Sequence, residues 1–130
     1  MSKVPADLQY TREHEWARKS GAVVVVGVTA HAQEALGDVV YVELPKVGVQ
    51  ITAGKPFGVI ESTKAVSELF APVGGRIVKV NDGLVDSPQT VNQDPYGQGW
   101  MIVVKYADAK ELDTLMSAAE YEKLIAAAGR

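Results

Sequence analysis

The chain has 130 residues, a formal net charge of -3 and no cysteine. This length fits one domain with one hydrophobic core. The missing cysteine excludes disulfides, thiolate nucleophiles and thiolate metal sites. Lys and Arg are scattered along the chain and predict no basic face, which argues against nucleic-acid binding. We therefore expect a single domain over residues 1–130, with its core in 22–106 and a helical segment in 108–127.

The sequence shows no segment for targeting or membrane insertion. Residues 1–5 contain neither an apolar h-region nor an Arg-rich amphipathic presequence. No apolar run approaches the length that spans a membrane. We therefore expect a cytoplasmic bacterial protein that acts as a monomer and binds neither membranes nor nucleic acid.

The first predicted elements are a hairpin and a short helix. The β-branched run Ala22–Val28 reads as a buried strand that pairs with His14–Arg18 before it. Thr29 offers a capping oxygen, and Ala30–Leu36 are good helix formers. Gly37 can adopt the left-handed conformation that closes a helix. This pattern predicts one helix directly after the hairpin.

Short β segments, separated by turn residues, occupy the middle of the chain. They are predicted at residues 39–44, 56–62, 65–70, 76–81 and 100–105. Strands of this length and spacing favour a sandwich or a barrel. The segment of residues 82–99 is longer than an ordinary connection between strands, which predicts an ordered loop or a short helical turn.

Two short helices are predicted in the C-terminal segment. Asp108–Glu111 and Ser117–Glu120 both match the capping box, in which the first and fourth residues bond each other's backbone. Apolar residues follow at helical spacing and are expected to lie against the sheet. They are Leu112, Leu115, Met116, Tyr121, Leu124 and Ile125.

The common catalytic and metal-binding patterns are missing from the sequence. His14 and His31 stand far apart without further metal-ligand spacing, so we expect ordinary surface or capping histidines and no metal site. No serine lies in a G-x-S-x-G elbow. The glycines of Gly97–Trp100 precede a strand and are turn formers rather than a dinucleotide loop. Chemistry at a lysine side chain is therefore the remaining candidate.

Lys64 stands between two predicted strands, among polar and acidic neighbours. A lysine nucleophile needs a desolvated setting, whereas nearby carboxylates favour the charged amine. An exposed lysine at a hairpin tip is, however, accessible to a modifying protein. The alternatives are a solvated surface lysine, or a small enzyme with Lys64 as base and Glu61 or Glu68 as acid.

Two sets of motifs stand around Lys64 and along the rest of the chain. The first set is Val47–Gly54, Glu61–Ala65, Ala71–Ile77 and Asn81; the second is His14–Trp16, Gly27–Thr29, His31–Gln33, Leu36–Asp38, Val42–Pro45, Ser87–Pro88, Val91–Asn92, Pro95–Tyr96 and Gly99–Trp100. The first set resembles lipoyl and biotinyl carrier domains, and the second resembles the H-protein family of the glycine cleavage system. A biotin carrier would have Met on both sides of the lysine, where Thr63 and Ala65 stand here. The resemblance extends from Tyr10 to Tyr121.

The resemblance implies a mainly β protein with short α-helices. Its core is a flattened β-sandwich of the lipoyl-domain, or barrel-sandwich hybrid, type. An N-terminal hairpin, one short helix and C-terminal helices complete it. It also implies a non-catalytic lipoyl carrier with (R)-lipoate on Lys64. The implied partners are glycine decarboxylase with pyridoxal phosphate, an aminomethyltransferase with tetrahydrofolate, dihydrolipoyl dehydrogenase and a lipoylating enzyme.

The family and the residue chemistry together suggest roles around the arm. We expect Glu15, His31, Leu36 and Glu68 to line a groove that shields the loaded arm from water, with a carboxylate meeting its cationic amine. The alternative is that the two glutamates are ordinary surface acids and Leu36 belongs to the core. Glu61 and Glu68 are further expected to help the lipoylating enzyme recognise its target. A lipoyl-donor or interaction role also remains open.

Overall fold

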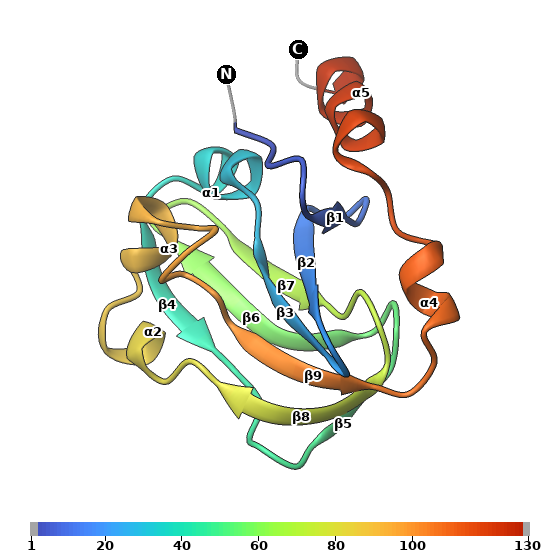
Figure 1. The fold of residues 1–130 in the computed structure, drawn as a ribbon. Coiled ribbons are helices and arrows are strands. Elements are labelled where there is room, and N and C mark those ends of the chain that lie inside the picture. The colour runs from blue at the N-terminus through green and yellow to red at the C-terminus, as the bar shows by residue number, and fades with distance from the viewer. Residues whose placement is uncertain (1–2, 129–130) are drawn as a thin grey trace.

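The computed structural model describes residues 3–128, and two β-sheets form its body (Figure 1). One sheet has six strands in the order β1-β2-β3-β9-β8-β5, and the other has three in the order β4-β6-β7. The strands are β1 (Gln9–Tyr10), β2 (Glu15–Ser20), β3 (Val23–Val28), β4 (Val39–Glu43), β5 (Gln50–Ile51), β6 (Pro56–Ser62), β7 (Val66–Phe70), β8 (Gly75–Val80) and β9 (Ile102–Tyr106). The mainly β fold that the resemblance implies is confirmed.

Five helices are found among the described residues. They are α1 (Ala30–Leu36), α2 (Gly83–Asp86), α3 (Thr90–Gln93), α4 (Lys110–Asp113) and α5 (Ala118–Ala128). The first three gather at one end of the sheets, whereas α4 and α5 lie at the opposite side (Figure 1). Within residues 3–128, no helix is long and apolar enough to cross a membrane.

The N-terminal hairpin forms as predicted, and the pairing of Trp16 with Gly27 fixes its register. A Cβ atom at Gly27 would lie 2.7 Å from the Trp16 ring, so only glycine leaves room for the indole. The Trp16 side chain is fully buried, and its ring nitrogen donates a hydrogen bond to the Pro95 carbonyl over 3.0 Å. The hairpin is thereby fastened to the loop that precedes β9.

Helix α1 begins and ends at the predicted residues. The Thr29 hydroxyl accepts a hydrogen bond from the Ala32 amide over 3.1 Å, which satisfies a free amide of the first turn. Gly37 closes the helix at φ +80°, a conformation that costs other residues free energy. Its amide donates to the Gln33 carbonyl.

The hydrophobic core lies mainly between the two sheets. Inward side chains of both sheets meet there, including Val24, Val26, Val42, Ile60, Leu69, Ile77, Ile102 and Val104, all nearly without exposed surface. A second cluster forms where α5 meets the hairpin, around Leu8, Tyr10, Trp16 and Tyr121. The sheets therefore supply a stiff body, and α5 is attached through a separate apolar contact.

Several local predictions need correction. The two-residue strands β1 and β5 were not predicted, and β9 begins at Ile102 rather than at residue 100. Residues 82–99 contain two short helices, where the sequence predicted an ordered loop or one short helical turn. The predicted capping box at Asp108–Glu111 is wrong, because the Glu111 carboxylate accepts the Gly74 amide over 2.8 Å instead. The second box is confirmed by bonds in both directions between Ser117 and Glu120.

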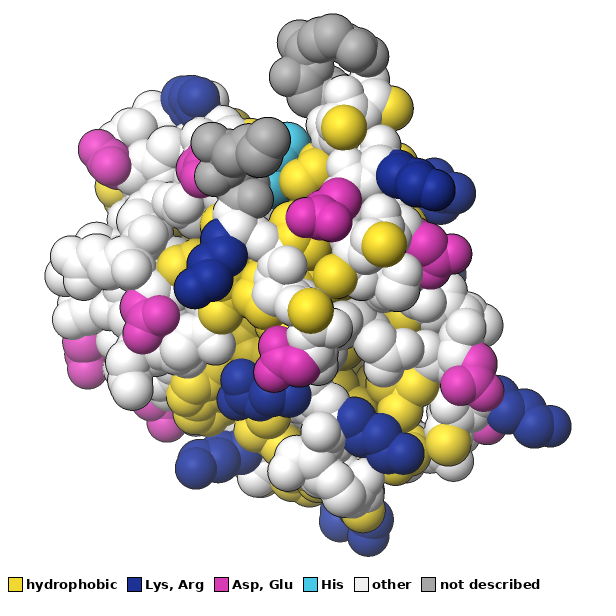
Figure 2. Space-filling model, turned by 45° about the horizontal axis from the view of Figure 1, so that its top comes forward, with side chains coloured by type: hydrophobic (Ala, Val, Ile, Leu, Met, Phe, Trp, Pro, Cys, Tyr) yellow, Lys and Arg dark blue, Asp and Glu magenta, His cyan; other side chains and the backbone are white. Residues whose placement is uncertain are grey.

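Some Lys and Arg residues of the six-stranded sheet lie closer together in the fold than in the sequence. Strand pairing places Arg18 and Lys79 in one row, and Arg76 and Lys105 are direct partners in the next row. Figure 2 shows Lys and Arg side chains close to hydrophobic surface on one face of the molecule. Cations that are scattered in the sequence therefore gather because pleated strands align them.

Candidate functional site

Lys64 lies in the exposed turn that joins β6 to β7. The Ser62 hydroxyl closes this turn by accepting the amides of Lys64 and Ala65 over 3.2 and 3.1 Å, and the Ser62 amide donates to the Ala65 carbonyl over 2.8 Å. No hydrogen-bond or ion-pair partner of the Lys64 amine is found among residues 3–128. The backbone of the tip is therefore fixed while its amine stays accessible.

A platform beneath Lys64 is built from the ends of α1 and α3, and Asn92 holds it together. The Asn92 side-chain amide donates to the Gln33 side chain and to the Gly37 carbonyl over 2.9 and 2.8 Å. Its oxygen accepts the Val39 amide over 2.9 Å. A Cβ atom at Gly37 would meet Cε of Lys64 at 3.5 Å, so the lysine stem lies against this platform.

Two acidic residues of β6 and β7 face outward near the tip. Ile60 and Leu69 are buried, so the adjacent Glu61 and Glu68 point to the opposite face of the three-stranded sheet. Glu61 pairs with the exposed Val66, next to the turn that carries Lys64. A partner that approaches the lysine over this face therefore meets carboxylates and exposed apolar surface together.

The far end of β7 leads to an open pocket of about 440 Å³ that contains Glu15. Its lining residues are Thr11, Glu13, Glu15, Ala53, Gly54, Phe70, Ala71, Pro72 and Thr114. Glu15 is 1% exposed, which rules out the alternative that it is an ordinary surface acid. One of its carboxyl oxygens accepts the Thr11 hydroxyl over 2.6 Å, and the other accepts the Phe70 amide over 3.1 Å.

Burial raises the pKa of Glu15 to about 7, against the lowering effect of its hydrogen bonds from Thr11 and Phe70. The carboxyl therefore holds a proton in part at neutral pH. Among the residues that the structure describes, no Lys, Arg or His lines this pocket, whereas Glu13 adds a second carboxyl group. A small cationic group would draw the proton off Glu15 and bind the carboxylate that remains.

The two histidines lie together, although they are far apart in the sequence. The His14 and His31 rings have centroids 4.8 Å apart, and Nδ1 of His14 lies 2.7 Å from the Tyr121 hydroxyl. Burial, and then the neighbouring His31, lower the pKa of His14. Among the described residues, no group of three or more His, Cys, Asp or Glu side chains could hold a metal ion.

Comparison with known proteins decides the family. A sequence model described as glycine cleavage H-protein matches residues 8–128. The chain belongs to the glycine cleavage H-protein family. It is 66% identical over 122 residues to a glycine cleavage system H protein of Myxococcus xanthus, covering 94% of this chain and 95% of that protein. A Carboxydothermus hydrogenoformans H protein is 54% identical over 125 residues, with 96% of each chain covered.

A solved structure shows the same fold. The crystal structure of a glycine cleavage system H protein from Mycobacterium marinum matches with a TM-score of 0.85 and 43% identity, covering 98% of this chain and all of that one. The flattened sandwich that the resemblance implies is therefore the fold of a glycine cleavage H protein. H proteins are the carrier component of the glycine cleavage system.

The four residues expected to line one groove of this H protein are not brought together in one pocket. Only Glu15 lines the pocket at the end of β7. His31 is half-buried against His14, and Leu36 is half-buried at the end of α1, where it packs against the core. Glu68 is exposed in the middle of β7. Glu15 begins β2, His31 and Leu36 lie on α1, and Glu68 lies on β7.

Sequence reasoning missed most of the pocket in this H protein. Thr11 and Glu13 lie in the turn before β2, and Phe70, Ala71 and Pro72 form the opposite wall. The first two stand beside the His14–Trp16 motif, which could have marked them. The contact of Phe70 with Glu15 spans 55 positions in the chain and left no local signal.

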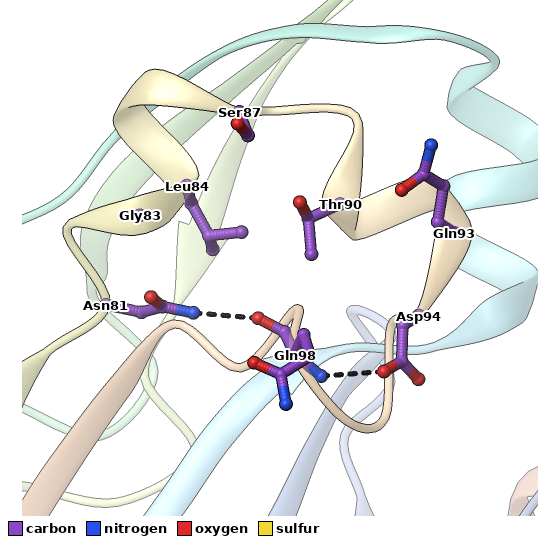
Figure 3. A pocket seen from close by; sticks show the side chains of 8 residues that line it. All are labelled: Asn81, Gly83, Leu84, Ser87, Thr90, Gln93, Asp94 and Gln98. Atoms are coloured by element: carbon purple, nitrogen blue, oxygen red, sulfur yellow. Dashed lines mark hydrogen bonds between the residues drawn. The ribbon is translucent and has the colours of Figure 1, made fainter.

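A second pocket of the H protein, of about 420 Å³, lies between α2, α3 and the loop before β9 (Figure 3). Its lining is polar, and its internal hydrogen bonds fasten the loop. The Asn81 side-chain amide donates to the carbonyls of Gln98 and Trp100 over 2.8 and 2.7 Å, and the Gln98 amide donates to the Asp94 carboxylate over 2.9 Å. None of the predicted site residues lines this pocket.

Proposed function

We propose that this H protein carries (R)-lipoate in amide linkage on Lys64. The observation that carries this proposal is the exposed amine of Lys64, which has no partner within residues 3–128 and stands at the tip of a hairpin whose backbone is fixed. The desolvated setting that a lysine nucleophile requires is missing at this tip, which speaks against a lysine-dependent enzyme. Modification by another protein requires only the accessible amine.

In the proposed cycle the arm shuttles the aminomethyl group of glycine between enzymes. Glycine decarboxylase would load it, the aminomethyltransferase would unload it to tetrahydrofolate, and dihydrolipoyl dehydrogenase would reoxidise the dithiol. The chain itself would catalyse none of these steps. Its task is to present the arm on a stiff body, which turns encounters in solution into local ones at high effective concentration.

Strand β7 leads from the turn of Lys64 toward the Glu15 pocket. From Val66 to Phe70 the strand covers about 13 Å at ~3.3 Å per residue, and Lys64 stands two residues before Val66. A lysine stem extended by a lipoyl chain reaches roughly 14 Å when straight. An arm folded back from Lys64 would therefore lie along much of β7, with its end directed toward the Glu15 pocket. Within residues 3–128, β7 has no strand neighbour on one side.

The Glu15 pocket suits the cationic amine at the end of a loaded arm. The buried carboxyl would lose its proton and pair with the amine, and the walls formed by Phe70 and Pro72 would exclude water. Leu36 would lie near the base of the arm and Glu68 beside its middle. His31 would act through His14, which precedes Glu15. This proposal keeps the four expected residues but distributes them along the path.

Intact-mass measurement and peptide mapping test the attachment site. After lipoylation, we expect a single lipoyl adduct on the peptide that contains Lys64. Lys55→Arg changes another exposed lysine, at the start of the same hairpin, and should leave the adduct in place. A biotinyl adduct, an adduct on another lysine, or no adduct would contradict the proposal.

Release of formaldehyde and ammonia from the loaded carrier tests the pocket. Glu15→Gln keeps the size of the side chain but cannot supply a carboxylate, so release should become several-fold faster. Glu43→Gln removes a carboxylate outside the pocket and serves as the control. Equal release rates for wild type and Glu15→Gln would exclude the pocket from protection of the arm.

A further inference from the structure

Tyr121 joins the C-terminal helix α5 to the turn before β2. Its side chain is fully buried and stacks on Tyr10, with ring centroids 4.7 Å apart and an interplanar angle of 8°. Its hydroxyl lies 2.7 Å from Nδ1 of His14 and 2.8 Å from Oγ1 of Thr29. One hydroxyl group therefore connects α5 both to the turn that precedes Glu15 and to the cap of α1.

The backbone of His14 is in the left-handed region, at φ +73°. This conformation costs a non-glycine residue free energy, and it persists where surrounding contacts hold it. The same turn aims Glu15. The His14 amide donates to the Thr11 carbonyl over 3.2 Å, the Glu15 amide donates to the Thr11 hydroxyl over 3.1 Å, and that hydroxyl donates to the Glu15 carboxyl.

The hydrogen bonds that each group can make decide which group donates to which among Thr29, Tyr121 and His14. The Thr29 hydroxyl oxygen already accepts the Ala32 amide, and its proton has the Tyr121 oxygen as its partner. Tyr121 then donates its own proton to Nδ1 of His14, which must be unprotonated there. In the reverse direction, the proton of the fully buried Thr29 hydroxyl would find no acceptor in the part of the chain that the structure describes, which is unfavourable.

We propose that Tyr121 is a positioning residue for the Glu15 pocket, whose role in holding the arm rests on the proposed function. By donating to Nδ1 of His14, its hydroxyl holds His14 in the left-handed turn that keeps Glu15 buried and aimed at the pocket. Helix α5 is therefore part of the machinery that shelters the arm, although it contributes no residue to the pocket lining.

The surroundings of His14 are consistent with a neutral imidazole ring that carries its proton on Nε2. The His31 ring of α1 lies against it, the Tyr10 ring of β1 stacks behind Tyr121, and Glu13 is the nearby acid in its own turn. Burial and His31 lower the pKa of His14, whereas Glu13 opposes this effect. Protonation at Nδ1 would reverse the hydrogen bond from Tyr121.

Two NMR measurements on the unmodified full-length protein test this inference. Nitrogen-15 shifts at pH 8 should show His14 in the Nε2–H form. A carbon-13 titration should show the pKa of Glu15 falling by about one unit in Tyr121→Phe, because a loosened turn hydrates the carboxyl. Leu124→Ala removes apolar contact from the same helix without touching the hydrogen bonds, and should leave this pKa unchanged.

A third variant separates positioning from general destabilisation. Glycine adopts the left-handed conformation without help, so in a His14→Gly background the change of Tyr121 to Phe should no longer shift the pKa of Glu15. An Nδ1–H tautomer in the wild type would overturn the inference. So would an unchanged pKa in Tyr121→Phe, or an equal fall in Leu124→Ala.

The outcome is independent of the proposed carrier cycle. If the titrations behave as expected but Glu15→Gln releases its cargo as slowly as wild type, the positioning of Glu15 stands and the sheltering role fails. If Glu15→Gln leaks but Tyr121→Phe neither leaks nor shifts the pKa of Glu15, the pocket stands and the role of Tyr121 is refuted.

Discussion

The two ends of strand β7 differ in almost every physical respect. At one end Lys64 stands exposed in a turn that is closed by its neighbours in the sequence. At the other end Glu15 is buried, and the Phe70 amide that binds it comes from 55 positions away. The first site is built by local contacts and the second by tertiary contacts.

This contrast shows how one small body can serve two opposed requirements. A carrier must expose its attachment point to several enzymes, yet it must also keep a labile cargo out of water. In the proposed cycle, separating the two sites along β7 would satisfy both, because the arm would move between them while the backbone stays fixed. The sites should therefore fail in different ways when they are altered.

The largest expected effect is the complete loss of carrier activity in Lys64→Arg. Arginine keeps the charge but has no amine that forms the amide, while the exposed position leaves the core untouched. Glycine–bicarbonate exchange with the other system components should fall to background, and the melting temperature should stay at the wild-type value. Residual exchange above background would show that another group carries the cargo.

Glu15→Gln should change how stability depends on pH. The pKa of Glu15 rises from 4.5 to about 7 on folding, so between these values the folded state holds a proton that the unfolded state has lost. The Glu15 carboxyl therefore stabilises the folded state fully below pH 4.5. This contribution to the free energy of unfolding, on the order of 3 kcal/mol, is lost as the pH rises through 7.

Urea unfolding of wild type and Glu15→Gln from pH 4.5 to 8.5 measures this contribution as the difference between the two profiles. His14 acts in the opposite sense, since its lowered pKa removes stability as the pH falls below 6.5, but it is common to both proteins. Gln93→Ala, which changes no titratable group at an exposed position of α3, is the control and should leave the slope unchanged. Parallel profiles would mean that Glu15 is not desolvated.

Asn92→Ala should break the platform beneath Lys64. It removes three hydrogen bonds that join α3 to the end of α1 and the start of β4, at a cost of about 2–3 kcal/mol of unfolding free energy. Gln93→Ala alters an exposed side chain of the same helix and should cost less than 0.5 kcal/mol, or about a fifth as much. Urea unfolding at pH 7 compares the two, and similar losses would contradict the platform.

Sequence analysis succeeded at the Lys64 end because its determinants are local. The bounds of β6, the capping of α1 by Thr29 and Gly37, and the hairpin of β2 and β3 all follow from neighbouring residues. Turn formers and period-two alternation report such features directly. The position of Lys64 between two strands is therefore readable without tertiary information.

The Glu15 end could be predicted only in part. The sequence motif pointed to Glu15, but its burial depends on β7, and the wall formed by Phe70 and Pro72 depends on the packing of the two sheets. Glu111 shows the same limit, since its side chain satisfies the distant Gly74 amide rather than its own helix. Strand β5 forms only because β8 offers a partner. Such features arise from contacts between distant segments.

The smallest expected effect concerns recognition at the exposed end. Glu61→Gln removes one outward carboxylate beside the turn of Lys64, so the lipoylating enzyme should bind more weakly, by roughly 1 kcal/mol or about fivefold. Glu43 lies on the same face, one row further from the tip, and Glu43→Gln should have a smaller effect. The initial rate of lipoylation at limiting carrier concentration measures the effect of each substitution. Raising the ionic strength should reduce the difference between wild type and Glu61→Gln, because salt screens charges at the surface. A normal rate for Glu61→Gln would assign recognition to the shape of the hairpin alone, since the fold of the tip depends on Ser62 and not on this carboxylate.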